Sequence, residues 1–296
     1  MVPDVEKFNV EVFEVEIMKV LVLGATGYIG GVVVERLLEQ GHEVAALVRR
    51  AGAEVPGVRD LRVGDLGSAA QAVTADIDAV VHAASLTGDE DADLSAIQAL
   101  VGAGKPVHYV SGIWVLGRTD EGSEGSVTNP VSIVGYRPKV EDIVLAAGGT
   151  VVRPGIVHGR GGGIAALFVG QAAERGVGVY VQGAYEEPTW AFVHVDDLAD
   201  LIVAAVERGA AGAVYHGVAE EGVAVKDFAG ATASAAGVSE VEAWPVEEAA
   251  SLLGAPFAEA LALSQRASSA LTREKLGWEP RRAGVLAEVG EGSYRR

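Results

Sequence analysis

From Val20 onward, short runs of apolar residues alternate with longer segments in which apolar residues recur every three or four positions. A short, continuous apolar run such as 20–23 is typical of a strand that is buried on both faces of a sheet. The longer segments, such as 28–40, predict amphipathic helices. Strands that alternate with helices in this way are joined by right-handed crossovers and form a parallel, doubly wound α/β sheet. The predicted strands are 20–23, 44–48, 61–63, 79–81, 107–110 and 150–152, and the predicted helices between them are 28–40, 91–101 and 138–147.

The second half of the chain is richer in helical patterns. We predict a sheet domain over residues 18–160, completed by a returning segment at about 190–218, and a smaller, mainly helical cap over 161–296. Residues 1–17 stand apart, because 9–17 roughly alternates apolar and acidic residues. We interpret 1–17 as an N-terminal extension, with an added edge strand as the alternative. The helices predicted in this half are 196–207, 226–236, 246–253 and 256–263, and the predicted strand is 213–215.

Composition narrows the class of partner. The formal charge of −18 disfavours nucleic acid and anionic membrane surfaces, because such a surface would repel both. No apolar run reaches the roughly 18 residues that a bilayer span needs. The chain has no cysteine and no histidine spacing typical of a metal site, so we expect no metal. These features suggest a cytoplasmic protein that acts on a small molecule, as a monomer or a homodimer.

A glycine-rich turn follows the first strand. Its residues are Gly24, Ala25, Thr26, Gly27, Tyr28, Ile29 and Gly30. Glycine at the first position permits the tight turn, at the fourth it lets backbone approach a pyrophosphate, and at the seventh it allows close packing of helix on strand. The phosphates of a dinucleotide would then lie on free N–H groups at the helix N-terminus.

The residues after the second strand bear on which dinucleotide is bound. An NAD-binding unit places an acidic residue there, to hold the ribose 2′-hydroxyl. This chain has Arg49 and Arg50 instead, which are suited to a 2′-phosphate. We therefore predict NADP as the cofactor, with NAD as the alternative.

Together with further motifs, this turn resembles the extended and atypical short-chain dehydrogenases/reductases, the group that contains the NAD-dependent epimerases and dehydratases. The resemblance extends from Met18 to about Arg281 and implies a Rossmann-type fold. It also implies that Asp65 and Leu66 lie at the adenine, that the His82-Ala83-Ala84 segment passes under the cofactor, and that Pro154 and Gly155 approach the nicotinamide. The motifs that carry it are 24–30, 64–66, 82–84, 153–159, 192–199 and 276–280.

The family's catalytic pattern is only partly present. The resemblance implies a tyrosine acid/base, a lysine four residues later that lowers the tyrosine pKa, and a serine or threonine that holds the substrate oxygen. No tyrosine here has lysine at the fourth following position. The nearest candidates are Tyr136 as acid/base, Lys139 as its helper and Ser111 as the oxygen holder. The family's hydroxyl position itself falls on Gly112.

We therefore expect an NADP-dependent oxidoreductase that transfers hydride to or from a carbonyl or alcohol of a small organic substrate, with a degenerate Ser/Tyr/Lys triad. Candidate substrate-pocket residues are Trp114, His158, Arg160 and Trp190. Two alternatives remain open. One is an NADP(H)-binding sensor without catalysis, and the other is a non-redox isomerase, dehydratase or cyclase on the same fold.

Overall fold

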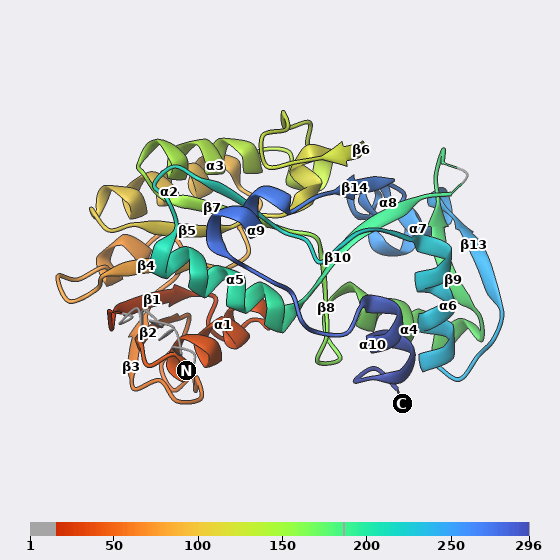
Figure 1. The fold of residues 1–296 in the computed structure, drawn as a ribbon, viewed down its shortest axis with the longest axis horizontal. Helices are drawn as coiled ribbons and strands as arrows, with labels where there is room; N and C mark the ends of the chain where they lie inside the picture. The colour runs from red at the N-terminus through yellow and green to blue at the C-terminus, as the bar shows by residue number, and fades with distance from the viewer. Residues whose placement is uncertain (1–15, 186, 296) are drawn as a thin grey trace, which may run out of the picture.

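A parallel sheet of 7 strands organises the larger lobe of the protein (Figure 1). The structure is a computed structural model and describes residues 16–185 and 187–295. The strand order across the sheet is β11-β7-β5-β4-β1-β2-β3. This arrangement confirms the predicted doubly wound sheet. Its strands are β1 (Lys19–Leu23), β2 (Glu43–Val48), β3 (Asp60–Val63), β4 (Ala79–His82), β5 (Val107–Val110), β7 (Thr150–Pro154) and β11 (Val214–Gly217).

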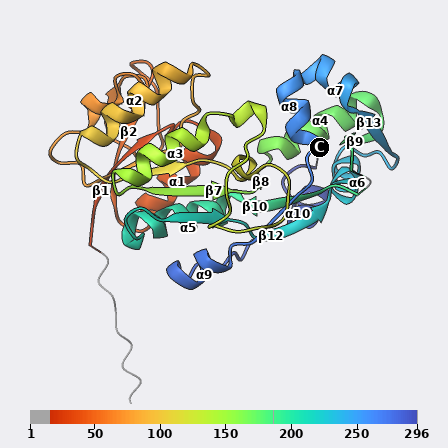
Figure 2. The same cartoon turned by 90° about the horizontal axis from the view of Figure 1, so that it is seen from above.

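Alternation along β1 shows why the sheet is covered on both faces. Val20 and Val22 pack with helices α1 (Tyr28–Glu39) and α5 (Val195–Arg208) in one core cluster. Leu21 and Leu23 point to the opposite face and pack with α2 (Glu90–Gly102) and α3 (Arg137–Ala146). Seen from above, α2 and α3 lie on one side of the sheet and α5 on the other (Figure 2). A strand with two apolar faces therefore has two helical layers to bury it.

The smaller lobe has its own apolar core and contains most of the second half of the chain (Figure 1). At its centre Phe168, Trp190, Phe192 and Phe228 pack ring against ring. Its helices are α4 (Gly163–Arg175), α6 (Val225–Ala235), α7 (Val246–Leu253), α8 (Ala255–Leu261) and α10 (Val285–Glu291). The short strands outside the main sheet are β6 (Thr119–Gly122), β8 (Ile156–His158), β9 (Gly178–Gln182), β10 (Thr189–His194), β12 (Glu220–Ala224), β13 (Val241–Pro245) and β14 (Gln265–Ala267). Helix α9 (Ala270–Leu276) and the 3₁₀ turns η1 (Ala69–Ala72), η2 (Ile113–Leu116) and η3 (Ser132–Val134) complete the elements.

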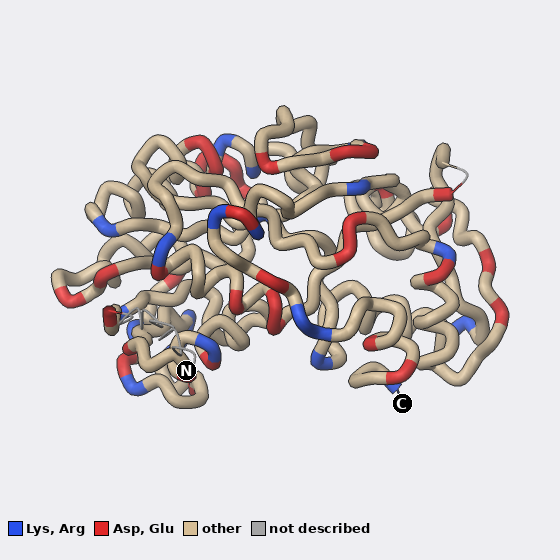
Figure 3. Tube along the Cα trace, in the orientation of Figure 1, with Lys and Arg blue, Asp and Glu red and all other residues tan. Residues whose placement is uncertain are grey.

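The returning segment behaves partly as the sequence suggests. Strand β11 pairs with β7 in parallel and completes the main sheet, whereas β10 pairs with β8 and β12 in a separate sheet. The glycine run 161–163 leads directly into α4. The predicted extension lies almost wholly outside the described residues. No described helix has the length and apolar character required to cross a bilayer. Acidic residues occur on both lobes (Figure 3).

Candidate functional site

The strand order reverses direction between β1 and β4, and this is where an open parallel sheet leaves a crevice at the carboxyl ends of its strands. A groove of about 560 Å³ lies there. The glycine turn after β1 forms one wall, and residues 83–87 after β4 form the other. The complete lining is Leu23, Gly24, Thr26, Gly27, Tyr28, Ile29, Leu47, Arg49, Gly64, Asp65, Leu66, Ala83, Ala84, Ser85, Leu86 and Thr87.

The turn between β1 and α1 depends on glycine at two positions. Gly24 has φ +85°, and a Cβ on it would lie 2.7 Å from the backbone of Ala83 and Ala84. A Cβ on Gly30 would lie 2.1 Å from the carbonyl oxygen of Gly24. The Gly27 amide donates to that same carbonyl at 2.8 Å and closes the turn. Side chains at these positions would therefore push α1 away from the sheet.

The N-terminus of α1 is suited to bind an anion. The first N–H groups of a helix have no intrahelical acceptor and carry a partial positive charge. No side chain caps this terminus, and its first turn contains no acidic residue. Helices α2 and α5, in contrast, begin with acidic residues and with a side chain that accepts a hydrogen bond from the first turn. Among these three helices, α1 is the one whose positive end is left to the groove.

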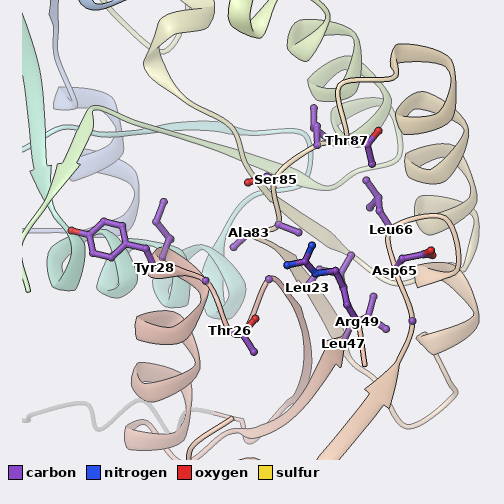
Figure 4. A pocket seen from close by; sticks show the side chains of 16 residues that line it. Leu23, Thr26, Tyr28, Leu47, Arg49, Asp65, Leu66, Ala83, Ser85 and Thr87 are labelled. Carbon is purple, nitrogen blue, oxygen red and sulfur yellow. The ribbon is translucent and has the colours of Figure 1, made fainter. Parts of the chain in front are cut away.

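Arg49 gives the groove a positive charge. Figure 4 shows its guanidinium directed into the groove, between the turn that carries Thr26 and the segment that begins at Ala83. Arg50 lines an adjoining hollow, which Arg49 and Thr26 also line. Both arginines follow β2, as the sequence suggested, and no described carboxylate lies within ion-pair distance of either one. An anionic group in this part of the groove would therefore find two free cations.

Asp65 and Leu66 line the far end of the groove. The Asp65 carboxylate accepts from the hydroxyl of Ser68 at 2.8 Å and from the Ser68 amide at 3.0 Å. These hydrogen bonds hold the Asp65 pKa below its usual range. The carboxylate therefore stays charged at the groove edge, and it also fixes the local turn.

Two residues of the predicted cofactor set face the core instead. Ala25 is 2% exposed and packs with α1 and α5. His82 is fully buried, and its ring packs edge-on against Tyr109. Burial lowers the His82 pKa to about 4, so the ring is neutral. Neither residue lines the groove, and their side chains act in packing.

A second, smaller cavity of about 230 Å³ adjoins the groove, since Tyr28 and Ile29 line both. Its side chains with polar atoms are Ser111, Arg137, Trp114 through its indole N–H, and Tyr28, whose hydroxyl donates to the Gly159 carbonyl at 2.8 Å. We call it the apolar pocket. The lining is Tyr28, Ile29, Ser111, Gly112, Ile113, Trp114, Val134, Arg137, Pro154, Gly155, Ile156, Val157, Gly163 and Ile164. Pro154, Gly155 and Trp114 therefore line a pocket that adjoins the groove.

The structure does not bring Tyr136, Ser111 and Lys139 together around this pocket. The Tyr136 hydroxyl donates to Asp93 at 2.6 Å, and burial together with this hydrogen bond raises the tyrosine pKa to about 12. Lys139 is exposed and pairs with Glu90. Neither Tyr136 nor Lys139 lines the pocket. The physical reason is that α3 begins at Arg137, so Tyr136 precedes the helix and its side chain lies against α2.

Ser111 does line the pocket, but its hydroxyl donates to Glu141 at 2.5 Å. Glu141 is 1% exposed and pairs with Arg153, whose Nη2 lies 2.6 Å from its Oε2. This buried group joins β5, α3 and β7 below the pocket. The Ser111 hydroxyl proton is therefore bonded to Glu141 and is not free for a substrate oxygen.

Three of the four predicted substrate-pocket residues lie elsewhere. Trp190 is buried in the smaller lobe and donates to the Leu263 carbonyl. His158 is 1% exposed and packs against Phe192, and burial lowers its pKa to about 3. Arg160 pairs with two acidic residues, Glu35 and Asp196. For these three, the prediction is corrected: packing and ion pairing account for their positions.

Arg137 is the pocket residue that sequence reasoning passed over, because it was treated as a spacer between Tyr136 and Lys139. The signal was available in the helix period. Arg137 and Glu141 are four residues apart and therefore lie on one face of α3, and Glu141 is buried on that face. Within the described residues there is no cluster of side chains that could hold a metal ion.

A parallel sheet with a glycine turn at the point where its strand order reverses is typical of dinucleotide-binding proteins. Comparison with known proteins identifies the family. The chain belongs to the NAD-dependent epimerase/dehydratase family, whose model matches residues 20–102. The full length is similar to two uncharacterized yeast proteins. It is 31% identical to one from Schizosaccharomyces pombe, over 94% of this chain and 100% of the relative. It is 30% identical to one from Saccharomyces cerevisiae, over 92% of this chain and 98% of the relative.

Solved structures that share the fold align with both lobes of this chain. The human epimerase family protein SDR39U1 with NADPH has a TM-score of 0.76 and 22% identity, over 93% of this chain and 99% of that chain. The Thermus thermophilus UDP-glucose 4-epimerase with NAD has a TM-score of 0.74 and 21% identity, over 94% of this chain and 99% of that chain. At this level of identity, the likeness shows a shared fold.

Proposed function

We propose that this protein is an NADP(H)-dependent oxidoreductase that reduces a carbonyl group of a small, mostly apolar compound. One observation carries the proposal: a groove lined by Arg49, which has no described carboxylate within ion-pair distance, adjoins an apolar pocket with which it shares Tyr28 and Ile29. Family membership and neighbours crystallised with NADPH or NAD support a dinucleotide in the groove.

The residues of the groove fit an NADP molecule. The α1 amides and the glycine turn would hold the pyrophosphate, because backbone can approach closely where Gly24 and Gly27 carry no side chain. Arg49 and Arg50 would bind the 2′-phosphate through charge-assisted hydrogen bonds. Asp65 and Leu66 would contact the adenine. When bound, reduced NADP supplies a hydride at its nicotinamide.

Next to the nicotinamide, the chain itself would orient the substrate. Pro154 and Gly155 form the wall at the carboxyl end of β7, and Trp114 closes the pocket beside Phe257. Mostly apolar walls lower the local dielectric constant, which would strengthen any polar contact made inside the pocket.

A second candidate function is NADP(H) binding without catalysis, in which a partner senses cofactor occupancy. The observation that favours it is the engagement of Tyr136 with Asp93, which leaves the phenol without access to the pocket. A non-redox isomerisation, dehydration or cyclisation on the same fold is favoured by no specific contact.

Isotope transfer separates these functions. The purified chain would be mixed with NADPH deuterated at the transferable nicotinamide position and with a panel of small ketones and aldehydes. We expect deuterium at the carbinol carbon of at least one product, and no transfer when the carbonyl compound is left out. Saturable NADPH binding with no deuterium in any product across the panel would instead favour the sensor.

A further inference from the structure

Arg137 is the one cation that lines the apolar pocket, and it has no acidic partner within the described residues. Arg153, on the adjacent strand, pairs with Glu141, and Arg160 pairs with Glu35 and Asp196. Arg137 therefore keeps its charge free for a group that enters the pocket.

The backbone around the pocket holds the guanidinium in place. Arg137 Nη1 donates to the Ser111 carbonyl at 3.0 Å, which uses one of the five N–H groups of the side chain. A Cβ on Gly112 would lie 3.3 Å from the same Nη1. Glycine at this position thus leaves room for the arginine where a side chain would crowd it. Ser111 in turn is fixed by Glu141, and that buried contact gives the guanidinium a rigid support.

The hydroxyl groups of the pocket are already engaged. The hydroxyl of Tyr28 donates to Gly159, and that of Ser111 donates to Glu141. The indole N–H of Trp114 is a further, neutral donor among the lining side chains, and the remaining walls are apolar side chains and backbone, with Ile113 and Ile156 among them. A substrate oxygen inside this pocket can therefore find side-chain N–H donors on Arg137.

We propose that Arg137 is the catalytic residue of the apolar pocket: its guanidinium binds the oxygen of a small, mostly apolar ketone or aldehyde and stabilises the negative charge that this oxygen gains during reduction. The inference rests on the proposed function and names the substrate class and the residue that acts on it.

The electron balance of the step is simple. Hydride from the reduced nicotinamide dinucleotide forms a C–H bond at the carbonyl carbon while the C=O π bond breaks, so that the carbonyl is reduced and the dinucleotide is oxidised. The oxygen becomes an alkoxide, which Arg137 stabilises by charge and hydrogen bonds. A proton from water then completes the alcohol.

Binding of a charged mimic tests this role without turnover. Benzoate carries a carboxylate on an apolar ring, and benzamide is its neutral counterpart. We expect benzoate to bind the complex of the protein with NADP⁺, measured by calorimetry, and Arg137→Met to weaken it by about 10–100-fold, as for loss of a charge-assisted hydrogen bond. Arg137→Met should weaken benzamide binding less than benzoate binding, because the amide oxygen carries no full charge, and should change NADPH binding by less than about 3-fold.

The matched control is Lys139→Met, which removes an exposed cation two residues away that pairs with Glu90. It should leave benzoate binding unchanged. On a carbonyl substrate, Arg137→Met should lower kcat by about 10²–10³-fold, as for loss of an oxyanion donor, and Arg137→Lys should restore part of it. Tyr136→Phe should leave kcat nearly unchanged.

Equal benzoate affinity in wild type and Arg137→Met, or no benzoate binding to a wild-type complex that holds NADP⁺, would overturn the role of Arg137. A wild-type chain that binds no NADP(H) would overturn the proposed function, and this inference with it.

Discussion

At the scale of single residues, Arg49 is the side chain that we expect to favour binding of NADP over NAD. Its guanidinium is directed into the groove beside Thr26, and it has no described carboxylate within ion-pair distance (Figure 4). A 2′-phosphate would supply the missing anion, whereas the 2′-hydroxyl of NAD would accept at most a neutral hydrogen bond.

Replacing this arginine should therefore separate the cofactors. We expect Arg49→Ala to raise the Kd for NADPH by about 10–100-fold, the cost of one charge-assisted contact, and to change the Kd for NADH by less than about 3-fold. Fluorescence titration of the reduced nicotinamide measures both. Arg59→Ala is the matched control, because Arg59 is exposed and lines no pocket of the groove. An equal loss for NADPH and NADH would remove the basis for naming NADP.

Single residues also show where sequence reasoning reached the site and where it failed. The glycine turn, the arginines after β2 and Pro154 lie at the groove or the pocket, because their positions follow from strand ends in a parallel sheet. Tyr136 was chosen by spacing to a lysine, but which face it presents depends on where α3 begins. The pairing of Tyr136 with Asp93 joins residues 43 positions apart, and local sequence does not contain that contact.

At the scale of elements, the packing of α1 on β1 sets the groove. Helix α1 lies close enough to the sheet that a Cβ on Gly30 would meet the Gly24 carbonyl oxygen at 2.1 Å. The same closeness brings the helix N-terminus to the groove at Gly27 and Tyr28. Packing and anion binding are therefore two results of one contact.

A methyl group at this contact should weaken both the packing of α1 on β1 and the binding of the dinucleotide. We expect Gly30→Ala to lower the free energy of unfolding by about 1–3 kcal/mol, the usual cost of overpacking, and to weaken NADPH binding as the helix moves outward. Gly31→Ala is the control. Its Cβ would lie 3.5 Å from the Ala25 carbonyl oxygen, an ordinary contact, so it should gain about 0.5–1 kcal/mol from helix propensity. Urea unfolding measures both, and equal stability of the two variants would contradict the packing argument.

The elements of the larger lobe could be predicted from their hydrophobic pattern. Those of the smaller lobe could be predicted only in part. Strands β1 and β2 contain continuous apolar runs, at 20–23 and 44–48, and are recognisable from the sequence. Helix α4 was not predicted from the sequence, because it begins at the last of three glycines and contains many small residues, which give little periodic contrast. Strand β8, with 3 residues, is too short to show a period, and its place depends on pairing with the distant β10.

On the scale of the whole molecule, burial of histidines couples stability to pH. Burial lowers the pKa of His82 and His108 to about 4 and that of His158 to about 3, from an ordinary value of 6.5. The folded chain therefore keeps these rings neutral where the unfolded chain protonates them. Protons favour the unfolded state between pH 6.5 and about 4, and stability should fall as pH falls through that range.

Each such histidine contributes about 1.4 kcal/mol per pH unit once the unfolded ring is protonated. We expect the urea midpoint to decrease steeply between pH 6.5 and pH 5. His82→Phe should reduce that slope by about one proton, because both nitrogens of the buried His82 ring lack a hydrogen-bond partner among the described residues and an apolar ring can replace it. A midpoint that is constant over this range would contradict neutral burial of these side chains.

The cations of the groove stand in a molecule whose net charge is strongly negative. Acidic residues occur on both lobes and the net charge is −18, so a dinucleotide phosphate is repelled over most of the surface (Figure 3). In the groove, attraction comes from the positive end of α1 and from Arg49, with Arg50 in the adjoining hollow. Local placement of cations, and not overall charge, makes anion binding possible in this chain.

Calorimetry of the wild-type chain with NADPH and with NADH tests the central claim most directly. The groove at the α1 N-terminus and the free arginines predict one NADPH bound per chain, with NADH bound about 10–100-fold more weakly. Absence of binding heat with both dinucleotides, confirmed by an unchanged melting temperature at saturating concentrations, would contradict the account.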